Sequence, residues 1–192
     1  NAPSFGGVTL LSPDENRLSA VLCDLLNPEG THGQGSSFLR LFVKQCGFGP
    51  ASTISSRVTV RRECCTIFIK SVKRRIDILV DGVTWGIGIE NKAWATEQKK
   101  QFPDYVEDLQ KRYDGKFLLL RLAGDDSEVK TLEKETTKLL VESGRFRTWT
   151  FSKEVDQWLA ACGRVCRAPR VSQFLKELHR YVGTTFKEEP DP

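Results

Sequence analysis

The sequence predicts a single α/β domain in which an antiparallel meander of strands is enclosed by helices at both ends of the chain. Helical periodicity near both ends and β-branched or alternating runs between residues 58 and 89 support this prediction. The length of 192 residues suits one domain with a sizeable core, and no linker is visible. We therefore expect one domain over residues 1–192, with flexible ends at residues 1–10 and 187–192.

Two helices are predicted in the N-terminal part. The first covers residues 13–26, where Ser12 is a candidate N-cap, Pro13 takes the first helical position and apolar residues recur every three or four positions. The second covers residues 36–46. Three glycines surround His32 in the intervening loop, and this histidine could bind metal or phosphate, although we favour a hydrogen bond that pins the loop.

Strands are predicted next. Apolar residues alternate with polar or basic ones over residues 58–60 and 66–72, and β-branched runs cover residues 76–80 and 83–89. The last two runs are separated by Asp81-Gly82, a hairpin signal. The remaining pattern predicts further elements in this order: a helix over 96–113, a strand over 116–122, a helix over 130–142, a strand over 148–151, and helices over 153–162 and 171–182.

Some classes of protein are excluded at this stage. No apolar stretch reaches 18 residues, so we expect no membrane-spanning helix. The six cysteines form no C-x-x-C pair and no signal peptide is visible, which favours reduced thiols in a cytoplasmic protein. Cys162 and Cys166 lie one helical turn apart and could share a metal, but small buried side chains are the more common use of free cysteines.

The most informative residues are charged groups at two apolar strands. Asp77 lies in the first strand, and Glu90, Asn91 and Lys92 end the second. Burying such groups without partners is costly, so something must compensate them. A symmetric turn at the hairpin leaves Asp77 and Glu90 about 13 Å apart, whereas a wider loop places them opposite each other on one face. The hypothesis of a shared ion requires this wider loop, a bulge or a strong twist.

Two converging carboxylates would suit Mg²⁺ or Mn²⁺, with the backbone carbonyl of Asn91, waters and a substrate phosphate as further ligands. A lysine two residues from a ligand carboxylate can hold a metal-activated water or offset charge on phosphorus, which a phosphodiester hydrolase requires. The alternative is that Asp77, Glu90 and Lys92 form a structural salt bridge at a sheet edge.

Basic residues gather before the first of these strands. The formal net charge is only +4, but seven basic residues and the single acid Glu63 occur between Arg57 and Arg75. The candidate contacts to nucleic-acid phosphates are Arg62, Lys73, Arg74, Arg75, Lys99 and Lys100. Arg61 and Lys70 fit a solvated strand face equally well. Trp85 and Trp94 could stack on bases, although packing is the commoner role of tryptophan.

An ordered set of four motifs resembles the PD-(D/E)XK nuclease superfamily, in its branch with an I-E-N-K strand. The resemblance extends from about residue 15 to residue 182 and weakens after residue 122. Its motifs are R-x-D-I-L-V at 75–80, I-E-N-K at 89–92, Gln101-x3-Tyr105, and an N-terminal set of Glu15-x3-Ser19, Leu25-Leu26-Asn27-Pro28 and His32-Gly33-x-Gly35.

This resemblance implies a mixed sheet flanked by helices, a restriction-endonuclease-like fold, and metal-dependent hydrolysis of phosphodiesters. It also implies that Asp77 and Glu90 ligate the metal, that Lys92 positions the water and that Glu15 reaches the metal shell. Gln101 would support the site from the next helix, with His32, Ser19 and Tyr105 as further supporting residues. Pro103 lacks the N–H that a regular helix needs in its interior, which predicts that Gln101 lies at a helix start.

The favoured function is a nuclease that cuts nucleic acid, with DNA the favoured substrate, by in-line attack of a metal-activated water. The first alternative is a non-catalytic nucleic-acid-binding module on the same fold. A third possibility is an interaction subunit of a defence or restriction assembly. A homodimer would be useful because a small nuclease often needs two sites to cut both strands.

Overall fold

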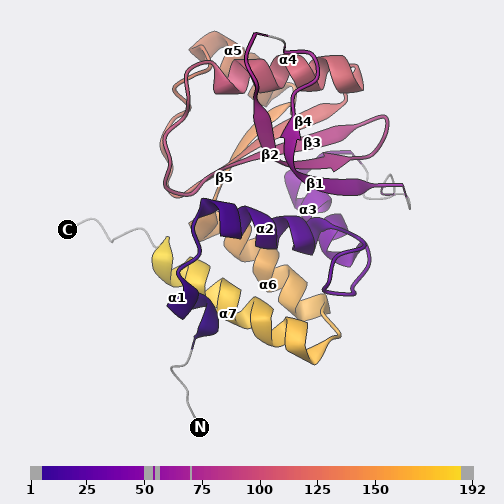
Figure 1. Cartoon of the computed structure of the whole chain (residues 1–192), viewed down its shortest axis with the longest axis vertical. Coiled ribbons are helices and arrows are strands. Elements are labelled where there is room, and N and C mark those ends of the chain that lie inside the picture. The colour runs from indigo at the N-terminus through magenta and orange to yellow at the C-terminus, as the bar shows by residue number, and fades with distance from the viewer. Residues whose placement is uncertain (1–5, 50–53, 55–56, 70, 187–192) are drawn as a thin grey trace, which may run out of the picture.

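A computed structural model places five strands in one sheet in the order β1-β2-β3-β4-β5 (Figure 1). It describes residues 6–49, 54, 57–69 and 71–186. The strands are β1 (Thr59–Cys65), β2 (Arg75–Asp81), β3 (Gly86–Lys92), β4 (Phe117–Ala123) and β5 (Phe146–Thr150). The first three strands are antiparallel, whereas β4 is parallel to both β3 and β5. The sheet is therefore mixed, and the predicted single α/β domain is confirmed.

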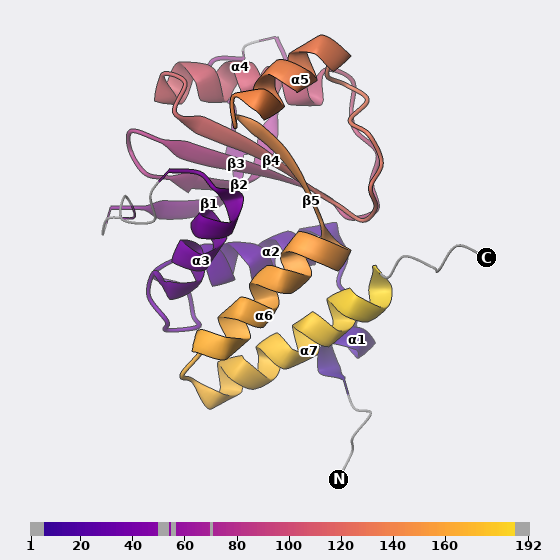
Figure 2. The same ribbon diagram turned by 180° about the vertical axis from the view of Figure 1, so that it is seen from behind.

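Helices cover both faces of this sheet. They are α1 (Gly7–Leu11), α2 (Glu15–Leu26), α3 (Ser37–Cys46), α4 (Gln101–Tyr113), α5 (Lys134–Glu142), α6 (Asp156–Val165) and α7 (Pro169–Thr185), with a π-helical turn η2 (Phe151–Val155) before α6. Figures 1 and 2 show α4 and α5 on one side of the sheet and α2, α3, α6 and α7 on the other. Each side has its own buried apolar cluster, so the sheet separates two cores.

The prediction of a strand over residues 66–72 is wrong. Strand β1 instead runs from Thr59 to Cys65, and the described residues after it, 66–69 and 71–72, form a loop. Asp108 of α4 anchors this loop, because its buried Oδ1 accepts hydrogen bonds from the backbone N–H groups of Ile67 and Phe68 at 2.6 and 2.8 Å. An alternation of apolar and basic residues cannot reveal such a partner, since Asp108 is some forty positions away in the sequence.

Several element boundaries also differ from the prediction. Helix α2 begins at Glu15 because Asp14 is its N-cap and accepts a hydrogen bond from the Arg17 N–H at 2.8 Å. Ser12 ends helix α1, which lies in the segment expected to be a flexible end and packs against α7. Helix α4 begins five positions later than predicted, at Gln101. The expected flexible end at residues 187–192 lies outside the described residues.

Each of the six cysteines, all within the described ranges, is a free thiol. Cys162 is fully buried in the core between α6 and its neighbours, and burial raises the pKa of its thiol above the ordinary range. A thiol of this kind is unreactive, which agrees with a packing role. None of the helices in the described residues is long and apolar enough to span a bilayer.

The start of β3 depends on a glycine. A Cβ atom at Gly86 would lie 2.1 Å from the ring of Tyr113, at the end of α4. We predict that Gly86→Ala lowers the free energy of unfolding by about 2 kcal/mol, because the ring has to move. Gly163 in α6 is the matched control: a Cβ there meets nothing within 4 Å, so Gly163→Ala is expected to stabilise the protein by about 0.5–1 kcal/mol. Urea unfolding of both variants measures these changes, and equal effects would contradict the assigned packing.

Candidate active site

The hairpin between β2 and β3 has the wider loop that the shared-ion hypothesis requires. Its ladder pairs Ile78 with Ile89 and Asp81 with Gly86, so four residues form the turn. Continued by one residue, this register places Asp77 opposite Glu90. The backbone N–H of Asn91 donates a hydrogen bond to Asp77 Oδ2 at 2.8 Å, which joins the two strands at this point. Of the three alternatives left open by the sequence, the wider loop is the one present.

Glu90 is almost completely buried and receives two donors on one oxygen. Lys92 Nζ lies 2.8 Å from its Oε1, and Gln101 Nε2 donates to the same atom at 2.6 Å. The other oxygen, Glu90 Oε2, is buried and has no hydrogen-bond partner among the described residues. A buried carboxylate oxygen without a partner is costly, so this atom is suited to a cation.

Gln101 and Tyr105 support Glu90 from the first turn of α4. Gln101 Nε2 also donates to the Tyr105 hydroxyl at 3.2 Å, and that hydroxyl donates to the backbone carbonyl of Arg75 at 2.5 Å. The two side chains thus connect the first turn of α4 to β2 and β3. Gln101 is the first residue of α4, as Pro103 predicts.

Asn91 points to the opposite face and holds helix α2. Its side-chain Nδ2 donates to the backbone carbonyl of Glu15 at 3.0 Å and to Ser19 Oγ at 3.1 Å. The Glu15 side chain reaches the end of β3, where its Oε1 accepts the backbone N–H groups of Trp94 and Ala95 at 2.8 and 2.7 Å. The start of α2 is therefore fixed beside the two strands.

The site is open to solvent through a cavity of about 490 Å³. Its wall includes Glu15, Asp77, Asn91 and Lys92. Glu90 lies behind this wall, because only about 1% of its surface is exposed. Asp77 and Lys92 thus face a space that a substrate phosphate could enter. Glu90 is held in the protein interior behind them.

Burial and charge change the acidity of both carboxyl groups. Burial raises the pKa of Glu90 to about 7, and the nearby charge of Asp77 adds to this effect while Lys92 opposes it. Burial also raises the pKa of Asp77, against the hydrogen bond from the Asn91 N–H and the charge of Lys92. Two adjacent carboxyl groups that resist ionisation are expected where a positive ion is to bind between them.

The donors present fit a hard divalent cation. Asp77, the unpartnered oxygen of Glu90 and a backbone carbonyl are oxygen ligands of the type that Mg²⁺ and Mn²⁺ prefer. Within the described ranges, no group of three histidine, cysteine, aspartate or glutamate side chains is placed to hold a metal. The remaining ligands would therefore be waters and substrate oxygens, which is usual for Mg²⁺.

The predicted phosphate contacts divide into two groups. Arg74 is withdrawn from solvent, because its Nε pairs with Asp104 at 2.8 Å and its other nitrogens bond to Gln98 and the backbone of Lys99. It positions the segment before α4. Arg75 forms an exposed pair with Glu63 at 3.1 Å. The other candidates, which all remain exposed, are Arg62, Lys73, Lys99 and Lys100.

His32 lies away from this cavity and pins its loop. Its Nε2 lies 2.9 Å from the carbonyl of Asn27, and its Nδ1 accepts the backbone N–H of Gln34 at 3.0 Å. Both ring nitrogens are therefore occupied by the main chain, as the favoured interpretation predicts.

A buried arginine beside the site was not predicted. Arg121 of β4 pairs in register with Glu90 of β3, and its Nε lies 3.6 Å from Glu97 Oε1. Glu97 also accepts the backbone N–H groups of Lys130 and Thr131, so the pair ties together the loops that follow β3 and β4. The signal was present in the sequence, since Arg121 is a charge within an apolar strand, as Asp77 is.

The fold and site together define a restriction-endonuclease-like domain, in which a mixed sheet brings Asp77 and Lys92 to an open cavity with the buried Glu90 behind them. A family model described as PD-(D/E)XK nuclease superfamily matches residues 6–181, and the chain belongs to this superfamily. Comparisons with curated proteins and with solved structures give no significant match. Membership supports a nuclease-type function, and nucleases of this superfamily generally use divalent metals.

Proposed function

We propose that this protein is a Mg²⁺- or Mn²⁺-dependent nuclease that hydrolyses phosphodiester bonds of DNA. The proposal rests on the register of β2 and β3, which places Asp77 opposite Glu90 when it is continued by one residue, and on the unpartnered buried oxygen of Glu90. Asp77, Glu90 and the Asn91 carbonyl would hold the cation. When bound, the cation supplies a Lewis acid for the scissile phosphate and lowers the pKa of water.

The protein's own groups then serve distinct roles. Lys92 lies at the cavity wall, and its ammonium would orient the attacking water and offset the negative charge that grows on phosphorus. Gln101 and Tyr105 hold Glu90 in one orientation. Glu15 acts through the backbone of Trp94 and Ala95, which it fixes directly after the catalytic strand.

Exposed basic residues that lie close to Asp77 and to the start of α4 in the sequence support a nucleic-acid substrate. Lys73 and Arg75 precede Asp77, and Lys99 and Lys100 precede α4, so phosphates on either side of the cut would meet positive charge. Contacts of this type do not read the base sequence. Binding is therefore expected to weaken steeply as salt is added.

A binding module without catalysis is the second candidate. The ion pair between Lys92 and Glu90, at 2.8 Å, favours it because each charge already has a partner. This pair leaves Glu90 Oε2 and the Asp77 side of the cavity unexplained, which is why we prefer the nuclease.

Titration of Mg²⁺ and Mn²⁺ with plasmid, linear duplex and single-stranded DNA, and with RNA, tests the proposal. We expect cleavage of DNA that rises with metal and stops in EDTA. Salt-sensitive retention of DNA without cutting under any metal would select the binding module. Cleavage that continues in EDTA would contradict the proposed site.

A further inference from the structure

Trp94 follows the catalytic strand by two residues and is unusually exposed for its size. About 52% of its surface is accessible. Its ring packs against Phe186, with ring centroids 5.2 Å apart and an angle of 33° between the planes, and Phe186 in turn stacks on Phe151 at 4.5 Å. The backbone N–H of Trp94 is fixed by Glu15. Phe186 thus packs against the indole and Glu15 fixes the backbone of Trp94, while part of the indole surface faces solvent.

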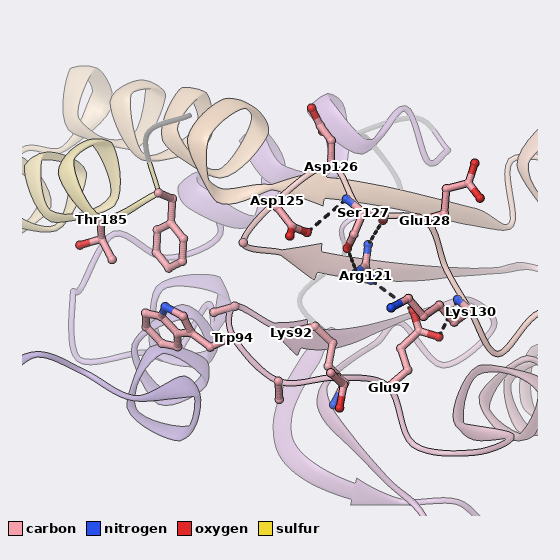
Figure 3. Close-up of a pocket in the computed structure, with 15 residues that line it drawn as sticks. Lys92, Trp94, Glu97, Arg121, Asp125, Asp126, Ser127, Glu128, Lys130 and Thr185 are labelled. Carbon is pink, nitrogen blue, oxygen red and sulfur yellow. Dashed lines mark hydrogen bonds and ion pairs between the residues drawn. The ribbon is translucent and has the colours of Figure 1, made fainter. Parts of the chain in front are cut away.

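This indole lines a second cavity, of about 620 Å³, that adjoins the first. Lys92, Trp94 and Ala95 belong to the walls of both cavities, so a substrate held at Lys92 can extend directly into the second one. Figure 3 shows Trp94 and Thr185 on one side of this cavity, and Arg121 and Ser127 on the other.

The charge of the second cavity disfavours a phosphate. Its wall carries four carboxylates against three cations. Glu97 is paired with Arg121 and Asp126 with Lys153, which leaves Asp125 and Glu128 outside these two ion pairs. Asp125 and Glu128 are exposed at the rim. Carboxylate oxygens are hydrogen-bond acceptors, so they suit the amino groups on the edges of nucleobases and repel the backbone. An aromatic face beside such acceptors matches a base rather than a phosphate.

We propose that Trp94 is a stacking platform for a nucleobase of the cut strand and that the second cavity receives this base. The inference rests on the proposed nuclease function of the adjacent site and deepens it by naming the substrate class. A base in a duplex is stacked on its neighbours, so one that reaches Trp94 must be unpaired. The preferred substrate is therefore single-stranded DNA or a duplex with an unpaired base at the cut.

Binding is measured in EDTA, so that the result does not depend on metal or cleavage. The probes are a short single-stranded oligodeoxynucleotide, the matching duplex, and an abasic strand of equal length that keeps the phosphates but has no bases. The variants are Trp94→Phe, which keeps an aromatic ring, and Trp94→Leu, which does not. Trp85→Phe is the control, because Trp85 is half-buried near the start of β3, at the opposite end of that strand.

We expect Trp94→Leu to weaken binding of the single strand about tenfold and to leave binding of the abasic strand unchanged. Trp94→Phe is expected to retain most of the affinity. The single strand should quench protein fluorescence in the wild type and in Trp85→Phe, and this quenching should be lost in Trp94→Phe. Thermal unfolding of each variant confirms that it is folded.

Equal loss of affinity for the single and the abasic strands in Trp94→Leu would overturn the stacking proposal, and so would unchanged affinity for both. Duplex binding as tight as single-strand binding would overturn the stated substrate class.

Cleavage by Asp77→Ala distinguishes the two proposals. If it is abolished while Trp94→Leu behaves as wild type, the nuclease proposal stands and stacking fails. If Asp77→Ala cleaves normally, the nuclease site fails, whatever Trp94 does.

Discussion

Asp77→Asn is expected to lower the rate of DNA cleavage at least about a thousandfold, a loss of about 4 kcal/mol of transition-state stabilisation. The amide removes a negative ligand from the cavity wall while keeping the size of the side chain. Lys92→Met is expected to cost about a hundredfold or more, because it removes the charge that faces the growing negative charge on phosphorus. Single-turnover cleavage of a labelled DNA strand measures both effects.

Asp81→Asn is the matched control. Asp81 lies at the other end of β2, where its Oδ2 forms an exposed pair with Arg61 at 3.0 Å. Its Oδ1 accepts the Val83 N–H at 3.0 Å, and the asparagine keeps this acceptor. Exposed pairs contribute little to stability, so this variant should fold and cleave as the wild type does. Activity that survives both Asp77→Asn and Lys92→Met, or that falls equally in all three variants, would show that the site is elsewhere.

The metal-free protein is expected to lose stability as the pH rises from about 4.5 to about 7. The pKa of Glu90 is raised from its ordinary value of 4.5 to about 7 in the folded state. Folded Glu90 thus keeps its proton over a range in which the unfolded chain releases it, so the folded state is favoured at the lower pH. The difference corresponds to about 3 kcal/mol, or about 5–10 °C in Tm. Thermal unfolding in EDTA at several pH values measures it.

Glu90→Gln isolates the effect, since the amide is similar in size and does not titrate. Its Tm should depend less on pH than the wild type's, and a parallel pH dependence in the two proteins would contradict the assigned pKa of Glu90. Added Mg²⁺ should raise the wild-type Tm more at pH 8 than at pH 5, because the cation needs the ionised carboxylates. Equal stabilisation at both pH values would place the cation at other groups.

The proposed reaction depends on how one turn is built. Asp77 and Glu90 face each other because β2 and β3 are joined by a four-residue turn, in which the Gly82 N–H donates to the Trp85 carbonyl at 2.9 Å. A two-residue turn at Asp81-Gly82 would move the carboxylates apart along the strands. The separation of the two acids is thus controlled at the far end of the hairpin.

The amino-acid order alone was sufficient for the fold class, for most of the elements and for the proposal of Asp77, Glu90 and Lys92 as site residues. These are local signals, because hydrophobic periodicity extends over a few residues and a charge in an apolar strand stands out from its neighbours. The position of Gln101 at a helix start follows from a local signal of the same kind, because Pro103 is tolerated only near the start of a helix.

The features that could not be predicted depend on contacts between residues far apart in the sequence. The loop after β1 depends on Asp108, the withdrawal of Arg74 depends on Asp104, and the pair of Arg121 with Glu97 joins two loops. The sequence did not determine the width of the hairpin loop. The wider loop is the one that forms when β2 pairs with β3. Such partners are distant in the chain and meet only when the whole domain is assembled, because their attraction becomes strong once burial has removed water from around them.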